Sequence, residues 1–356
     1  MSQTSLSKLI DQLHVEGYVA DRALAEKVLN RMDVAQPWYV RAMVGFGAWL
    51  ASLMLISFIV GLSVAFDSGY LVIGGLMVFA GCYVRRKYDS DFMVQASLAV
   101  GLSGQALFAY GISEILGHDV ESEEFLLATF FTSGFVFWIF PDRTLRVLEA
   151  LFMTAAAVIL MYHWELKALI PLLGPMLATA MVYLQQTEAR WIVRFRGEQA
   201  RAAMTGLMLS AFGCVLLSTV YLLPELGEDL SIYPRPWLST LLLGALLLYL
   251  GGRLWPLVFG DNMTAVYAGY ALMLAVIAAA WANPGLILAL IVIILGTSSS
   301  SRALTGAGIG FLVVFTAMYF YGIEISLLTK SATLVTTGAV ILFARWLILK
   351  LAGADE

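Results

Sequence analysis

Few residues of this sequence could do chemistry within its long apolar stretches, and Glu149 is the first of them. It lies about one turn inside an apolar segment, three residues after Arg146 and six after Arg143. In hydrocarbon an ionised side chain costs about 2.5–3.5 kcal/mol on insertion scales, so such residues usually face an ion or substrate path. Glu149 is therefore a candidate site residue. The alternative is an ion pair with one of the two arginines near the end of a helix.

Four uncharged residues are the next candidates, for substrate contact or for helix packing: Gln95, Gln105, Pro171 and Pro175. The two glutamines lie on either side of a Gly-x-x-Gly step in one apolar segment, where they either hydrogen-bond to a neighbouring helix or line a cavity. The two prolines interrupt another segment. A broken helix can offer backbone carbonyls to a substrate, and the alternative is a kink that serves packing.

Four ionisable residues near the ends of apolar segments complete the set: His118, His163, Glu324 and Lys330. The histidines stand near carboxylates but lack the spacing of a metal motif, so they are weak metal candidates, and we expect neither a metal nor a cofactor. Glu324 and Lys330 flank one polar corner, where they form either a substrate contact or an interfacial ion pair. The sequence has no catalytic triad, HExxH, phosphate-loop or CxxC pattern, which argues against an enzyme.

Membrane-spanning helices must position these candidates. Hydrophobic residues make up 60% of the chain, charged residues 13%, and the mean hydropathy is +0.85, whereas soluble domains carry about 25% charged residues. Only helices and closed barrels span hydrocarbon, and continuous apolar runs favour helices. The sequence therefore predicts an all-α integral membrane protein with twelve spans: 40–65, 69–84, 92–114, 125–140, 145–162, 168–185, 203–223, 237–252, 263–281, 284–298, 303–321 and 331–351. The fourth and tenth are short for a bilayer core of about 30 Å.

The positions of the positive charges predict how the chain is threaded. With the N-terminus inside, three of the 21 lysines and arginines fall in outer connections and the other eighteen fall inside. Because Lys and Arg are retained on the cytoplasmic side of short loops, both termini are predicted to be cytoplasmic. The net charge of −4 argues against a nucleic-acid partner. The lipid bilayer is the first expected partner.

Four parts follow from this threading. Residues 1–36 form a cytoplasmic amphipathic helical segment, 37–185 a first six-helix half, 186–202 a basic loop along the inner membrane surface, and 203–356 a second six-helix half. Glycine- and serine-rich helix faces at 206–210 and 306–310 would allow close helix packing.

The polar corner near the C-terminus carries a longer pattern. From Tyr321 to Gly338 the sequence reads Tyr-Gly-Ile-x-x-x-x-Leu-x-Lys-Ser-x-x-Leu-x-x-x-Gly. This pattern resembles the end of a group of polytopic bacterial membrane proteins described as a domain of unknown function. The resemblance implies a place in the bacterial cytoplasmic (inner) membrane and association with a second membrane protein that carries a GDYXXLXY motif. It supplies no catalytic residues.

Two functions fit these observations. The first is a structural or accessory subunit of a membrane complex, favoured by the scarcity of buried charge, the small-residue faces and the partner that the resemblance implies. The alternative is a transporter for a neutral or weakly polar small molecule, favoured by the number of spans and the interrupted segment 168–185. Intramembrane polarity separates the two, because a coupled carrier needs ionisable groups in its core.

Overall fold

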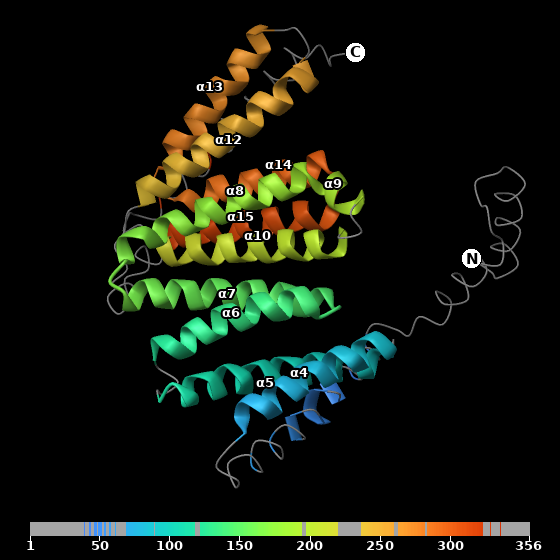
Figure 1. Ribbon diagram of the computed structural model, residues 1–356. Helices are drawn as coiled ribbons and strands as arrows, with labels where there is room; N and C mark the ends of the chain where they lie inside the picture. Colours follow the sequence, from blue (N-terminus) through green and yellow to red (C-terminus); the bar gives the residue numbers. More distant parts are fainter. Residues whose placement is uncertain are drawn as a thin grey trace, which may run out of the picture. The chain divides into compact units, whose positions relative to one another are not determined.

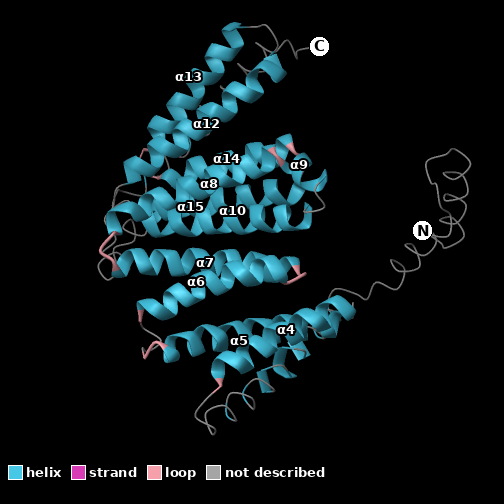
Figure 2. Cartoon of the chain, viewed as in Figure 1, coloured by secondary structure: helices cyan, strands magenta, loops and turns pink. Residues whose placement is uncertain are grey.

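The computed structural model describes residues 69–88, 90–117, 122–193, 197–219, 236–259, 263–281 and 283–322, with isolated positions between 39 and 61 and at 328 and 335. Within these residues the chain forms helices and no strand (Figure 2). The predicted all-α class is confirmed for them. Contacts divide the chain into two units, one of Met1–Ser68 with Phe79–Gly101 and one of Gly69–Val78 with Leu102–Glu356.

Each predicted segment between 69 and 321 coincides with one helix. The predicted segment 331–351 and most of 40–65 lie outside the described residues. The helices are α4 (Tyr70–Lys87), α5 (Asp91–Ile115), α6 (Glu123–Ile139), α7 (Arg143–His163), α8 (Ile170–Gln186) after the 3-10 turn η1 (Lys167–Leu169), α9 (Glu188–Val193), α10 (Gly197–Thr219), α12 (Pro236–Phe259), α13 (Met263–Ala279), α14 (Pro284–Ser298) and α15 (Arg302–Gly322).

Six helical stretches in the described part of the chain are long and apolar enough to cross a membrane: Asp91–Ile115, Arg143–His163, Lys167–Gln186, Gly197–Thr219, Trp237–Leu254 and Arg302–Phe320. Two apolar helices are shorter, and α14 with its 15 residues is only about 22 Å long at 1.5 Å per residue. These helices are those of a multi-pass membrane protein. The twelve spans and the orientation of the termini stay predictions.

A hydrophobic core of the second unit lies among α8, α10, α12, α14 and α15, which pack against one another (Figure 1). The ring of Phe212 on α10 stacks on that of Phe311 on α15 with centroids 3.6 Å apart. Phe315, Leu243 and Ile291 are fully buried around them. Helices on both sides of the 186–202 loop therefore share one core.

Glycines bring α4 and α5 into close contact within the second unit. A Cβ added to Gly74 would collide with the backbone of Phe108, and one added to Gly104 would lie 2.7 Å from Cβ of Met77. A Cβ on Gly111 would meet the backbone of Leu71. The first half of α4 is therefore held against the second half of α5, the half that carries Gln105.

Candidate functional site

The turn between α6 and α7 sets how far along their helices the candidate residues lie. The C-terminal cap residue of α6, Phe140, donates its backbone N–H to the carbonyl of Val136. Pro141 follows, and Asp142 caps α7 by accepting hydrogen bonds from the backbone N–H groups of Thr144 at 2.8 Å and Leu145 at 3.2 Å. A cap of this kind satisfies amides that have no partner within the helix. Two antiparallel helices are thus joined by a short, ordered turn.

Ser133 and Glu149 lie at the same distance from this corner. Ser133 is six residues before the end of α6 at Ile139, and Glu149 is six residues after the start of α7 at Arg143. At 1.5 Å per residue, each lies about 9 Å along its helix from the turn. Because the two helices pack side by side (Figure 1), these residues come to one level of the hairpin.

Glu149 is completely enclosed, with a relative exposure of 1%. Both of its carboxylate oxygens are buried and neither has a hydrogen-bond partner. Gln105 of α5 and Ser133 of α6 are the polar side chains that face the carboxylate, although neither meets the geometry of a hydrogen bond to it. The Gln105 amide Nε2 instead donates to Ser133 Oγ at 2.8 Å. Three helices therefore bring one carboxylate, one amide and one hydroxyl together.

The ion pair expected for Glu149 is not found as a hydrogen-bonded contact. The Nε of Arg146 donates to the carbonyl of Phe137 at 3.2 Å, and Nη2 of Arg143 donates to Thr205 Oγ1 at 3.4 Å. Both guanidinium groups thus make other contacts near the helix start. An ion pair of Glu149 with Arg146 or Arg143 stays a prediction, and the polar side chains that face the carboxylate are Gln105 of α5 and Ser133 of α6.

α10 holds α7 in place beside the site. A Cβ added to Gly206 would lie 2.5 Å from Cβ of Ala150, the residue next to Glu149. One turn further along, Thr154 Oγ1 donates to Ser210 Oγ at 3.0 Å. The small-residue face predicted at 206–210 is therefore used for close packing against α7, and this contact fixes the direction in which Glu149 points.

The two prolines of α8 lie at a packed contact. Pro171 stands at the start of α8 and Pro175 inside it. Because Pro175 has no N–H, it cannot donate to the carbonyl of Pro171 four residues earlier. Ser239 Oγ on α12 donates to that carbonyl at 2.5 Å. The freed carbonyl is therefore occupied by a neighbouring helix.

The remaining candidates lie apart from Glu149 or outside the described residues. In the first unit, Gln95 Oε1 accepts a hydrogen bond from Trp49 Nε1 at 3.0 Å. His163 ends α7, and the described residues contain no group of three His, Cys, Asp or Glu side chains that could hold a metal. His118, Glu324 and Lys330 are outside the described part of the chain.

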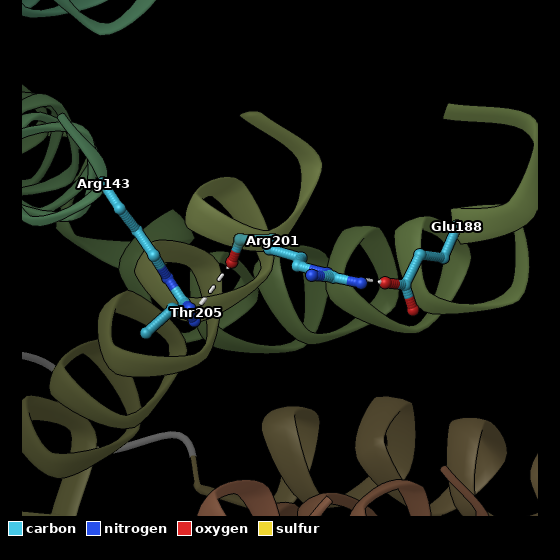
Figure 3. A network of polar contacts seen from close by, with 4 residues as sticks. All are labelled: Arg143, Glu188, Arg201 and Thr205. Atoms are coloured by element: carbon cyan, nitrogen blue, oxygen red, sulfur yellow. Dashed lines mark hydrogen bonds and ion pairs between the residues drawn. The ribbon is translucent and has the colours of Figure 1, made fainter. Parts of the chain in front are cut away.

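The predicted basic loop at 186–202 contains α9, and its charges make local contacts. Arg201 Nε pairs with Glu188 Oε1 at 3.0 Å, and Thr205 Oγ1 donates to the carbonyl of Arg201 at 2.9 Å. Figure 3 shows Arg143 reaching the same Thr205 from α7. These contacts tie the start of α10 to α9 and α7.

A comparison with protein families identifies the family of the chain. A family model described as a domain of unknown function (DUF4401) matches residues 37–351. The chain belongs to this family. The predicted membership of a domain of unknown function is thereby confirmed over most of the chain, and the association with a second membrane protein that carries a GDYXXLXY motif stays a prediction. The searches of curated proteins and of solved structures find no match. The site of this DUF4401 chain must therefore be argued from its own residues.

Sequence reasoning missed Ser133 and Ser239, the two hydroxyl groups that complete these contacts. A signal for Ser133 was available, because it and Glu149 are equally far from the Pro141 corner. For Ser239 the signal was weaker. The spacing of Pro171 and Pro175 shows that a carbonyl loses its donor, but nothing local shows which of the other helices supplies a new one.

Proposed function

We propose that this protein is a transporter of the bacterial cytoplasmic membrane that carries a neutral or weakly polar small molecule, and that it is not an enzyme. The single observation that supports the proposal is the buried carboxylate of Glu149, which two polar side chains from other helices face. Ionisable groups at membrane depth are rare and usually belong to substrate or ion paths.

The other buried charged residues in the described part of the chain have structural roles, whereas Glu149 has none. Among the described residues, Asp142, Arg146 and Glu149 are the charged side chains that are buried. Asp142 caps α7 and Arg146 binds the carbonyl of Phe137. A structural role accounts for both. Glu149 caps nothing and has no hydrogen-bond partner, so packing alone gives no reason for a carboxylate at this position.

The transport proposal includes a threading of twelve spans with both termini in the cytoplasm. In that threading the start of α7 faces the cytoplasm, and Glu149 lies about 9 Å along the helix from Arg143, within a hydrocarbon core of about 30 Å. Fusions of a cytoplasmic reporter after 87, 186 and 254 should all be active, and fusions after 117 and 281 should be inactive. The opposite pattern would refute this threading.

Transport itself is tested by reconstituting the protein into vesicles. Uptake of a panel of radiolabelled neutral solutes should saturate for at least one class, and Glu149→Gln should lower it at least tenfold. Glu198→Gln, which changes an exposed carboxylate on α10, is the matched control and should leave uptake unchanged. Uptake that is not saturable for every solute class, or equal uptake by both variants, would overturn the proposal.

The second candidate function is a structural or accessory subunit of a membrane complex. It is favoured by α15, where Gly308 packs against Ile293 on one side of the helix. Gly306 and Gly310 lie on the other side, and a Cβ added to either would meet no described atom within 4 Å. Glycines four residues apart allow another helix to approach closely. If this candidate holds, mild extraction should recover a second membrane protein in stoichiometric amount. A protein that is solitary and monodisperse after such extraction would exclude it.

A further inference from the structure

We propose that Glu149, Gln105 and Ser133 form a binding site for one Na⁺ ion within the membrane. The three residues come from α7, α5 and α6, and all three are buried, with relative exposures of 1%, 5% and 0%. Each offers oxygen, the element that hard monovalent cations prefer as a ligand. The site deepens the proposed function, because it supplies a coupling ion for the transporter.

The site contains buried oxygens that accept no hydrogen bond. Oε1 and Oε2 of Glu149 and Oε1 of Gln105 are all buried without a hydrogen-bond partner. Ser133 Oγ already accepts one amide hydrogen of Gln105. The hydroxyl hydrogen of Ser133 and the second Nε2 hydrogen of Gln105 can each serve one of these three oxygens at most. At least one acceptor remains. Native proteins satisfy such groups with water, an ion or a ligand, since each costs about 1–3 kcal/mol when left unpaired.

The balance of charge points to a monovalent ion. Glu149 contributes one negative charge, and a single positive charge neutralises it without leaving a net charge in hydrocarbon. A divalent ion would leave an excess charge of one. The described residues also contain no group of three His, Cys, Asp or Glu side chains, which transition metals and Ca²⁺ commonly use.

Among the described residues, no charged group donates a hydrogen bond to the carboxylate of Glu149. On α7, Arg146 binds the carbonyl of Phe137 and Arg143 binds Thr205. Arg201 on α10 pairs with Glu188. On α6 the acidic residues Glu123 and Glu124 are in the first turn. They lie ten and nine residues before Ser133, or about 14–15 Å along the helix at 1.5 Å per residue.

The helices that carry the three residues hold them in a fixed arrangement that suits a small ion. The 2.8 Å hydrogen bond from Gln105 to Ser133 draws α5 and α6 together beside Glu149, while the contact of Gly206 with Ala150 holds α7 from its other side. The ligands therefore come from rigid helices rather than loops. Such a preorganised site suits a small ion such as Na⁺ better than a large organic cation.

Direct binding of ²²Na⁺ to the purified full-length protein in nanodiscs tests the site. The protein is prepared in buffer whose only cation is N-methylglucamine and titrated with ²²NaCl at constant ionic strength. We expect saturable binding of one ion per chain. Glu149→Gln should lose it by at least tenfold in affinity, Ser133→Ala should weaken it, and Glu198→Gln should bind as the unmodified protein does.

The remaining outcomes each support or overturn the site. If Glu149→Gln fails to fold, judged by a loss of monodispersity, Ser133→Ala decides, because it keeps the carboxylate and removes one ligand. Absence of saturable ²²Na⁺ binding by the unmodified protein, including a result in which only protons are taken up, overturns the site, as does equal binding by Ser133→Ala and the unmodified protein. Na⁺ binding without flux of any solute would keep the site and refute transport, and flux without Na⁺ binding would do the reverse.

Discussion

Removing the hydroxyl of Ser239 should lower the free energy of unfolding, because the Pro171 carbonyl in α8 would then have no hydrogen-bond donor. Pro175 cannot donate to the carbonyl of Pro171, and Ser239 Oγ takes over that hydrogen bond at 2.5 Å. Ser239 itself has a relative exposure of 0%, so water cannot replace it easily. Ser239→Ala should therefore leave a backbone carbonyl unpaired between α8 and α12.

The expected loss of stability follows from two ranges of hydrogen-bond free energy. An unsatisfied buried carbonyl costs about 1–3 kcal/mol in soluble proteins, whereas hydrogen bonds between membrane helices average about 0.6 kcal/mol with a maximum near 1.7. Because the proline removes the usual donor, we expect Ser239→Ala to lie at the upper end of the second range. The free energy of unfolding should fall by about 1.5 kcal/mol.

Unfolding in mixed detergent, followed by circular dichroism, measures this loss, and a double-mutant cycle gives its cause. Pro175→Ala restores a backbone N–H that can donate to the Pro171 carbonyl, so Ser239→Ala should cost about 0.5 kcal/mol or less in that background. Ser218→Ala is the matched control. Its buried hydroxyl donates to the carbonyl of Cys214, which also receives a helical amide. Equal costs of Ser239→Ala with and without Pro175 would refute the reasoning.

Two further predictions concern α10. Gly206→Val should lower the free energy of unfolding by about 1–3 kcal/mol, since the new Cβ would lie 2.5 Å from that of Ala150. Gly213→Ala, where no described atom lies within 4 Å of the added Cβ, should be neutral or slightly stabilising. Equal effects of the two variants in detergent unfolding would contradict the packing. Arg201→Ala should cost less than about 1 kcal/mol, because its pair with Glu188 is partly exposed. A larger loss, or one insensitive to salt, would show that this pair is more than a surface contact.

Much of the local structure could be predicted from the sequence because it depends on neighbouring residues. Continuous apolar runs give helices in hydrocarbon, and the described helices begin and end near the predicted segments. The start of α7 is a good example. Asp142 follows Pro141 and precedes an apolar run, and it does cap the helix. Family membership was also readable, since it rests on a pattern of residues along the chain.

The partners of polar side chains needed the tertiary structure. Glu149 has arginines three and six residues before it, and this spacing favoured an ion pair near the helix start. The packing of three helices places Gln105 and Ser133 beside the carboxylate, and the sequence did not show this.

The sequence by itself thus determined the all-α class, the helices and the presence of one carboxylate within an apolar helix. The tertiary structure decided which groups surround that carboxylate and which helix supplies the donor for Pro171. The physical reason is the separation along the chain over which each kind of interaction acts. Hydrophobic periodicity and capping act within a few residues, whereas the meeting of Gln105 with Ser133 joins positions 28 residues apart and depends on how whole helices pack.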